Sequence, residues 1–272
     1  MDISGNAIIF GAGGAIGRAT AMAFARGGAR GLLVADIDLE AAQSTASDIR
    51  ADMNQPELRV EAVHVDATIL ESVEAAFKQM VDAFGRFDYC VTTVGIPVKT
   101  PMPTADALVS EFIETQNVNV TGTFLIIRTA LAIMRTQEAK PNFPDAPVRG
   151  TTRGAVVALG SALSINAGPN FIQYTTSKHA VIGLIKTAAL DSVNDNIRVN
   201  CVCPCWIESN MTRSLAQTIP GFEAAMPNHM PMGRIGAPEE IADAVLFLCS
   251  PRASLVTGTS LIADGGMCVS LG

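Results

Sequence analysis

Short apolar runs alternate with longer stretches whose apolar positions recur with helical spacing, and this alternation continues through most of the chain. It predicts strands at 7–10, 31–35, 59–64, 88–92, 155–159, 197–202 and 260–263. It predicts helices from about residue 15 and at 39–53, 70–84, 105–117, 121–135, 173–193 and 238–249. Because strand–helix–strand connections are right-handed, we expect a doubly wound α/β fold of Rossmann type with a mostly parallel seven-stranded sheet.

Two segments interrupt this alternation. Residues 138–154 are polar and contain three prolines, which predicts a surface loop. Residues from about 204 to 236 are irregular and rich in methionine, and we interpret them as a mobile cover over a substrate site. A methionine-rich segment can equally belong to a core. The length of 272 residues fits one dinucleotide-binding catalytic domain, residues 1–272.

Composition narrows the class of partner. The net charge of −7 and the pI near 5.0 oppose binding to nucleic acid or anionic lipid. No stretch is predicted to span a membrane, and the first residues lack the basic and apolar regions of a signal peptide. The six cysteines have no metal-ligand spacing and are expected to be small buried side chains. We therefore expect a cytoplasmic protein without a metal and without a nucleic-acid or membrane partner.

A glycine-rich turn follows the first predicted strand. Gly11, Gly13, Gly14 and Gly17 lie between this strand and a predicted helix, where backbone amides and the helix dipole can receive a pyrophosphate. The spacing departs from G-x-G-x-x-G because Ile16 occupies its last position. A glycine-rich turn without a ligand therefore remains the alternative.

Two acidic residues follow the next two strands. Asp36 ends the second strand, where a carboxylate can accept hydrogen bonds from ribose hydroxyls and repel a 2′-phosphate. This position favours NAD over NADP. Asp66 follows the third strand, at the place where the sheet edge would meet the adenine. Each acid could instead cap the helix that follows it.

A tyrosine and a lysine four residues apart carry the candidate chemistry. Tyr174 and Lys178 would share one face of a helix, and a cation beside a phenol favours the phenolate. Ser161 ends a preceding strand and could orient a substrate oxygen. His179 would point about 100° away from the pair. The alternatives are a packing tyrosine, a solvated lysine and a serine that caps a helix.

These residues together resemble the short-chain dehydrogenase/reductase family of the classical type over nearly the whole chain. The resemblance rests also on Gly95, NVNVTGTF around Asn119, Pro204, GAPEEIA at 236–242 and ADGG at 263–266. It implies a catalytic tetrad of Asn119, Ser161, Tyr174 and Lys178, in which Asn119 holds a water near Lys178. The cofactor contacts that we expect are Gly11, Gly14, Ile16, Gly17, Asp36, Asp66, Ala67, Thr92, Gly95, Tyr174, Lys178, Ile207 and Ser209.

Some positions depart from the family pattern. Phe10 replaces a threonine, Ala15 replaces the middle glycine of the turn, and Cys205 replaces the glycine of a Pro-Gly pair. The family's Asn-Asn-Ala-Gly is Thr-Thr-Val-Gly here, ending at Gly95, so amide contacts become hydroxyl contacts. None of these changes removes an acid or a base.

The sequence therefore predicts an NAD-dependent oxidoreductase that interconverts a secondary alcohol and a ketone, with Tyr174 as general acid and base. An apolar, cyclic or terpenoid-like substrate would suit the side chains that we expect around it: Ile96, Val98, Leu163, Phe171, Trp206, Met211, Leu215, Ile219, Phe222, Met226, Met230 and Met232. The alternatives are a ketoreductase, a reduction coupled to another biosynthetic step, and a dinucleotide-binding protein without turnover. The resemblance also implies a homotetramer that pairs through helices 121–135 and 173–193.

Overall fold

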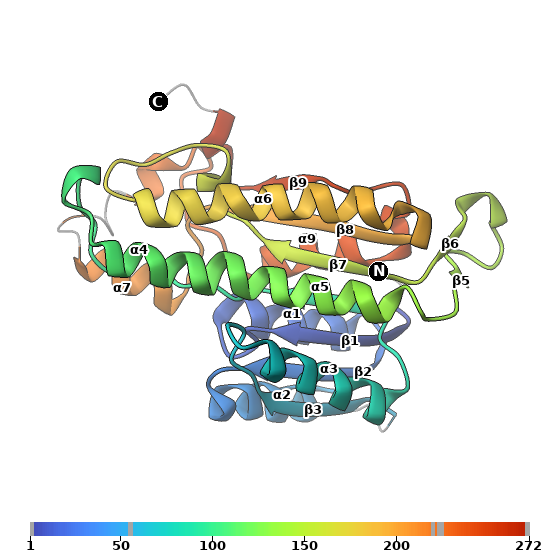
Figure 1. Ribbon diagram of the computed structural model, residues 1–272. Coiled ribbons are helices and arrows are strands. Elements are labelled where there is room, and N and C mark those ends of the chain that lie inside the picture. The colour runs from blue at the N-terminus through green and yellow to red at the C-terminus, as the bar shows by residue number, and fades with distance from the viewer. Residues whose placement is uncertain (1–2, 54–56, 219–220, 222–225, 270–272) are drawn as a thin grey trace.

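A seven-stranded sheet of parallel strands forms the centre of the computed structural model, which describes residues 3–53, 57–218, 221 and 226–269 (Figure 1). The strand order is β3-β2-β1-β4-β7-β8-β9. The expected doubly wound fold is confirmed, and every pairing in this sheet is parallel. Its strands are β1 (Gly5–Phe10), β2 (Ala29–Asp36), β3 (Arg59–His64), β4 (Tyr89–Thr92), β7 (Gly154–Leu159), β8 (Ile197–Pro204) and β9 (Ser260–Ala263).

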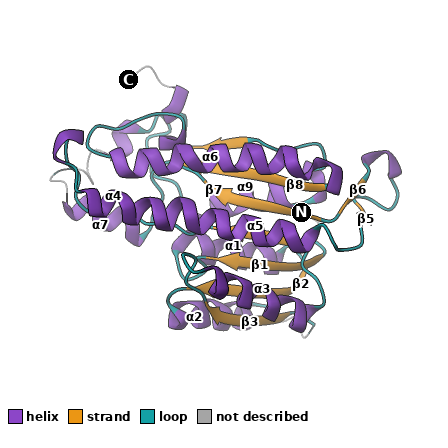
Figure 2. Ribbon diagram, viewed as in Figure 1, coloured by secondary structure: helices purple, strands orange, loops and turns teal. Residues whose placement is uncertain are grey.

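Helices cover both faces of the sheet (Figures 1 and 2). One face carries α1 (Ala15–Arg26), α2 (Leu39–Asp52) and α9 (Pro238–Cys249). The other carries α3 (Leu70–Phe84), α5 (Thr123–Met134) and α6 (Ile172–Ser192), with α4 (Val109–Gln116) packed on α6. Single 3₁₀ turns are η1 (Thr104–Asp106), η3 (Pro147–Arg149), η4 (Ala162–Ser164), η5 (Val193–Asp195), η6 (Met226–His229), η7 (Pro251–Ala253) and η8 (Met267–Val269).

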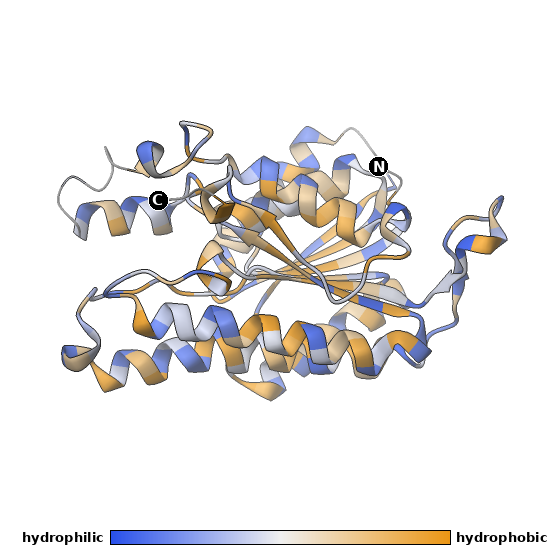
Figure 3. Cartoon of the chain, turned by 90° about the horizontal axis from the view of Figure 1, so that it is seen from above, coloured by the Kyte–Doolittle hydropathy of each residue, from blue (hydrophilic) through white to orange (hydrophobic). Residues whose placement is uncertain are grey.

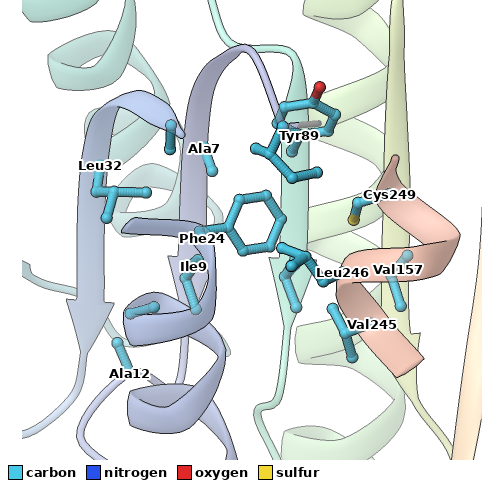
Figure 4. Packing of buried hydrophobic residues seen from close by; sticks show 14 of the residues in the cluster. Ala7, Ile9, Ala12, Phe24, Leu32, Tyr89, Val157, Val245, Leu246 and Cys249 are labelled. Carbon is cyan, nitrogen blue, oxygen red and sulfur yellow. The ribbon is translucent and has the colours of Figure 1, made fainter. Parts of the chain in front are cut away.

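The strands are apolar along their whole length because both of their faces are buried. Figure 3 shows this apolar sheet between two layers of helices whose outer faces carry more polar residues. On one side, Phe24 of α1 is fully buried against the sheet, with its ring centre 5.5 Å from that of Tyr89 (Figure 4). On the other side, the ring centre of Phe77 lies 5.3 Å from that of Phe10 and 5.2 Å from that of Phe87. Two apolar layers therefore hold the strand ends in fixed positions.

The prediction of two separate helices at 105–117 and 121–135 was wrong. A π-helical segment, η2 (Asn117–Gly122), joins α4 to α5, so that helix runs without a break from Val109 to Met134. In the described part of the chain, this one helix is long and apolar enough to cross a membrane by length and composition alone, contrary to our expectation. Helices packed into a protein core meet the same criterion, and Ile126, Ala130 and Met134 are completely buried.

The segment 138–154 is more ordered than the predicted surface loop. It contains a short antiparallel hairpin of β5 (Lys140–Pro141) and β6 (Thr151–Thr152). Arg149 fixes the tip, since its guanidinium lies 4.2 Å from the ring centre of Phe143 and donates to Ser254 Oγ at 2.9 Å. The hairpin projects from the end of the sheet opposite α7 (Figure 1).

The predicted cover also contains regular structure. Helix α7 (Asn210–Thr218) and η6 lie within it. An isolated parallel β-bridge between Ile207 and Gly236 joins the two ends of the segment. Met226 and Met230 are buried, whereas Met232 is exposed. The expected wall residues Ile219 and Phe222 lie outside the described residues.

Candidate active site

A groove of about 500 Å³ runs across the carboxyl ends of β1, β2 and β4. The turn between β1 and α1 forms its floor. Gly11 has φ +79°, and a methyl group added at Gly17 would lie 2.0 Å from the carbonyl oxygen of Gly11. The close approach of α1 to the turn therefore requires glycine at Gly17. A floor without side chains at these positions can receive a pyrophosphate at the first turn of α1.

Asp36 holds the turn as well as lining the groove. Its carboxylate accepts hydrogen bonds from the amides of Gly13 at 2.8 Å and Asp38 at 3.0 Å. Asp38, rather than Asp36, caps α2 by accepting from the amide of Ala41 at 3.1 Å. The alternative of Asp36 as a helix cap is therefore wrong. Among the described residues that line the groove there is no arginine or lysine that could pair with a 2′-phosphate.

Asp66 also lines the groove, beside Ala67. Its Oδ1 accepts from the hydroxyl of Thr68 at 2.6 Å and from the amide of Thr68 at 2.8 Å. These hydrogen bonds, first the hydroxyl and then the amide, lower the pKa of Asp66 below its usual value. Asp66 does not cap α3, whose N-cap is Ile69. The carboxylate is thus fixed in a turn at the edge of the groove.

Most of the expected cofactor contacts line this groove. They are Gly11, Gly14, Ile16, Gly17, Asp36, Asp66, Ala67, Gly95 and Ser209. Thr92 does not: it is the last residue of β4, and only 1% of its surface is exposed. Thr93 lines the groove instead, and its hydroxyl donates to the carbonyl oxygens of Phe10 and Gly11 at 3.0 Å each. Ile207 also lies off the groove walls, buried beneath the cover and against Gly236.

Tyr174 and Lys178 lie one helical turn apart near the start of α6, as the spacing predicts. The ammonium of Lys178 is 5.6 Å from the centre of the Tyr174 ring and donates to the carbonyl oxygen of Leu159 at 2.9 Å. Only 4% of Lys178 is exposed. A buried cation therefore lies beside the phenol, at the end of β7. His179 is exposed and contacts the carbonyl oxygen of Thr175.

Ser161 serves two purposes. Its Oγ accepts from the amide of Leu163 at 3.1 Å, and it forms a reciprocal capping box with Ser164 at η4. The capping alternative is therefore correct, but it does not exclude a role in the site. Since the backbone amide occupies an acceptor position of Oγ, the hydroxyl proton stays available for donation. Ser161 and Tyr174 line the same cavity.

The π segment places Asn119 behind the reactive groups. Its side chain is completely buried, accepts from the amide of Ile96 at 2.8 Å and donates to Ser177 Oγ at 3.0 Å. A methyl group added at Gly95 would lie 3.4 Å from both Asn119 Oδ1 and Lys178 Nζ. Asn119, Gly95 and Lys178 therefore meet at the inner end of the groove. π-helical turns occur often at functional sites because they redirect a side chain.

A second cavity, of about 90 Å³, opens beside Tyr174 and adjoins the groove at Met211, which lines both. Its walls are largely apolar. Beside Ser161 and Tyr174, they consist of Pro97, Val98, Ala162, Leu163, Phe171, Cys205, Trp206, Met211, Thr212, Leu215 and Met267. Pro97, Ala162, Cys205, Thr212 and Met267 were not expected there. Ile96 lines the nucleotide groove instead, and Met226, Met230 and Met232 line neither cavity. No charged side chain lines the described part of this cavity.

The cysteines have no ligand geometry. All six are free thiols, four of them are buried, and burial raises the pKa of Cys249 to about 12. Within the described ranges, no group of three or more histidine, cysteine or acidic side chains could hold a metal ion.

Comparisons with known proteins agree with this geometry. A family model described as enoyl-(acyl carrier protein) reductase matches residues 11–268. Short-chain dehydrogenase RED2 of Pyricularia oryzae is 49% identical over 98% of this chain and 97% of its own length. The 2,5-dichloro-2,5-cyclohexadiene-1,4-diol dehydrogenase of Sphingobium indicum is 33% identical, over 97% and 98% of the two chains.

Solved structures show the same fold. Levodione reductase superimposes with a TM-score of 0.86 at 30% identity, over 97% of this chain and 98% of its own. A 3-ketoacyl-(acyl-carrier-protein) reductase of Brucella melitensis, complexed with NADH, gives 0.81 at 28% identity over 97% and 98%. The match of the family model over most of the sequence, together with these relatives, makes the chain an oxidoreductase of the short-chain dehydrogenase/reductase family.

Proposed function

We propose that this enzyme uses NAD to interconvert a secondary alcohol and a ketone on an apolar, cyclic small molecule. The observation that carries the proposal is the shared cavity of Ser161 and Tyr174, which is otherwise largely apolar and adjoins a groove that contains Asp36. A substrate oxygen in this cavity would lie near two hydroxyl groups. The carbon that bears the oxygen would face the groove.

The residues have separate tasks in this reaction. Ser161, whose Oγ is held by the amide of Leu163, donates a hydrogen bond to the substrate oxygen. During oxidation Tyr174 accepts the hydroxyl proton, and during reduction it returns the proton to the ketone oxygen. The buried ammonium of Lys178, which lies 5.6 Å from the centre of the Tyr174 ring, stabilises the phenolate. A nicotinamide dinucleotide held in the groove would supply the hydride chemistry, accepting the hydride during oxidation and returning it during reduction.

The proposed cofactor is NAD rather than NADP. Asp36 would face the ribose with a negative charge, and no arginine or lysine among the described lining residues would offset it. The Brucella relative was crystallised with NADH. These observations favour a ribose with a free 2′-hydroxyl.

The cavity favours a substrate with one ring. Its volume of about 90 Å³ is small for a larger terpenoid skeleton, and its described lining has no cation for a phosphate or for an acyl-carrier group. One relative at 33% identity is named as the dehydrogenase of a cyclic diol. We therefore narrow the cyclic or terpenoid-like alcohol expected from sequence to a one-ring alcohol or diol.

A reductive physiological direction is the second candidate. The solved relative at 30% identity is named a reductase, and the same four residues serve both directions. A reduction coupled to another biosynthetic step would use the same site. Analysis of the product by mass spectrometry and chirality separates these cases, because a simple dehydrogenase changes only the oxidation level of one carbon.

We also propose a homotetramer in the cytoplasm. The outer groove between α5 and α6 is lined by apolar side chains, among them Phe124, Leu131 and Leu184, and by Arg128, Arg135, Asp191 and Asp195. Phe124 and Leu190 are 45% and 74% exposed. Exposed apolar faces of this kind mark association surfaces. The free thiols fit a reducing compartment. Light scattering at micromolar concentration that showed a monomer would overturn the tetramer.

The test of function is a spectrophotometric screen with purified protein. One-ring and two-ring secondary alcohols are incubated with NAD or NADP, and the reverse reaction is run with the matching ketones. We expect turnover of a one-ring alcohol with NAD, and a loss of at least about a hundredfold in kcat for Tyr174→Phe with little change in NADH affinity. Unchanged turnover in Tyr174→Phe would refute the acid/base assignment.

A further inference from the structure

A buried carboxylate that the proposed chemistry does not use lies beside the substrate cavity. Glu111 belongs to α4, and only 6% of it is exposed. It forms no ion pair with any residue that the structure describes. A buried charge without a cation needs several hydrogen-bond donors to remain ionised. The identity of those donors indicates what the residue does.

The donors come from two different parts of the chain. Glu111 Oε1 accepts from the backbone amides of Lys99 at 2.5 Å and Thr100 at 3.0 Å, and from Gln173 Nε2 at 3.1 Å. Burial by itself would raise the pKa of Glu111, but these hydrogen bonds outweigh burial and lower it below the usual value. The side chain is therefore an anion at neutral pH, with its hydrogen bonds formed.

Each donor adjoins a wall of the substrate cavity. Lys99 and Thr100 continue directly from Pro97 and Val98, which line the cavity. Gln173 precedes Tyr174, is almost completely buried, and its carbonyl oxygen accepts from Gln116 Nε2 at 2.8 Å. The carboxylate thus connects the segment 97–100 to the residue next to the proposed acid/base.

A second contact joins the same two regions. The amide of Met102 donates to the carbonyl oxygen of Asn170 at 3.3 Å, next to the cavity residue Phe171. The opposite wall belongs to other segments, with Trp206, Met211 and Leu215 from the cover. Among the described residues, the side-chain hydrogen bonds of Glu111 go to Lys99, Thr100 and Gln173, and none goes to that wall. One wall is therefore fixed to α6, and the other belongs to the cover.

We infer that Glu111 is a positioning residue that sets the distance between the Pro97–Val98 wall and Tyr174, and through it the ring size that the enzyme accepts. The inference rests on the proposed function, since it concerns the substrate of the same site. With the carboxylate in place, a one-ring substrate contacts both Val98 and the phenol. Without it, the wall is released, and a small ring loses more contact than a large one.

The test uses Glu111→Gln, which keeps the shape of the side chain and removes its charge. Glu74→Gln is the matched control, because Glu74 is half exposed on α3 and 3.7 Å from Arg128. Hydrogen–deuterium exchange of a peptide that covers 97–103 is measured first. We expect exchange there to become about tenfold faster in Glu111→Gln, with β7 unchanged and Glu74→Gln like the wild type. Unchanged exchange at 97–103 would overturn the inference, whatever the activity.

Kinetics give the second measurement. For Glu111→Gln we expect KM for a one-ring alcohol to rise about tenfold, KM for a two-ring alcohol to rise much less, and kcat to change by less than about threefold. Affinity for NADH should remain within about twofold of wild type. A purely structural role would instead lower kcat with both substrates in parallel with the unfolding temperature, and that result overturns the inference.

A third variant tests the connection through Gln173. If Glu111 acts through this residue, adding Gln173→Met to Glu111→Gln should change the one-ring KM by less than about twofold. If Gln173→Met raised the one-ring KM by the same factor in Glu111→Gln as in the wild type, Glu111 would not act through Gln173. Failure of the wild type to turn over any alcohol or ketone would refute the proposed function, whereas the exchange measurement still decides whether Glu111 holds the wall.

Discussion

Alanine at Gly17 tests whether the nucleotide turn depends on the absence of a single methyl group. The added carbon would lie 2.0 Å from the carbonyl oxygen of Gly11, 2.7 Å from its carbonyl carbon and 2.8 Å from Thr93 Oγ1. Two of these neighbours are backbone atoms, which cannot rotate away. Ordinary contacts begin near 3.4 Å, so α1 and the turn must separate by more than about 1 Å.

Two energies of opposite sign decide the outcome. Alanine inside a helix is favoured over glycine by about 1 kcal/mol, whereas overpacking of this kind costs about 1–3 kcal/mol. We expect a net loss of up to about 2 kcal/mol, which lowers the unfolding temperature of a chain this long by several degrees. Because the displaced amides belong to the groove floor, the Kd for NADH should rise at least about tenfold.

The assay combines thermal unfolding with titration of NADH fluorescence. Gly14→Ala is the comparison, since its methyl group would lie 3.4 Å from the carbonyl oxygen of Gly11. Its unfolding temperature should stay within about 2 °C of wild type. If Gly17→Ala bound NADH with wild-type affinity and unfolded at the wild-type temperature, the steric account of the turn would be wrong.

Three further changes can be tested in the same way. Asp36→Ala should narrow the preference for NADH over NADPH in fluorescence titrations, because it removes the negative charge at the ribose; an unchanged ratio would mean that another residue makes this selection. Arg198→Met should destabilise the protein by roughly 3 kcal/mol in urea denaturation, since the buried guanidinium donates to the carbonyl oxygens of Leu248, Cys249 and Ser250; a loss below about 1 kcal/mol would contradict this. Asp66 has a lowered pKa in the folded state, so its stabilising contribution is complete above about pH 5 and disappears as the pH falls through that lowered value. Asp66→Asn should therefore be less stable than wild type at pH 7, and the difference in unfolding free energy should shrink as the pH falls below the usual pKa of aspartate. A difference that stayed constant with pH would show that the pKa of Asp66 is not coupled to folding.

The sequence was most informative where the signal is local. Apolar runs predicted β3 and β9 with the bounds that the structure has. The four-residue spacing of Tyr174 and Lys178 placed both on one face of α6, because helical geometry fixes that relation. Asn119 was identified by family resemblance alone, since a buried asparagine in an apolar helix has no spacing signal of its own.

Contacts between distant segments were not predictable. The predicted end of β4 at residue 92 is the observed one. Adjacent residues along a strand point in opposite directions, and the apolar run alone did not show which of Thr92 and Thr93 faces the groove. The hydrogen bond between Glu111 and Gln173 spans 62 positions, and that between Arg149 and Ser254 spans 105. Neither contact produces a periodic pattern in the sequence. The hydrogen bonds of Glu111 to the 97–100 segment and the ordered hairpin at 138–154 were therefore found only in the structure.

Glu111 and Asn119 lie on one helix, and the π-helical segment at 117–122 sets how far their side chains are rotated from each other around the helix axis. This relation depends on the number of residues between them and not on which residues these are. Asn119 accepts a hydrogen bond from the amide of Ile96, and Glu111 accepts from the amides of Lys99 and Thr100. Both side chains therefore bind the same loop from one continuous helix. Deletion of one residue between them would convert the π-helical segment into regular α-helix and rotate Asn119 by about 100° relative to Glu111. A single-residue deletion here should therefore be far more damaging than most substitutions, although no charged group would be lost.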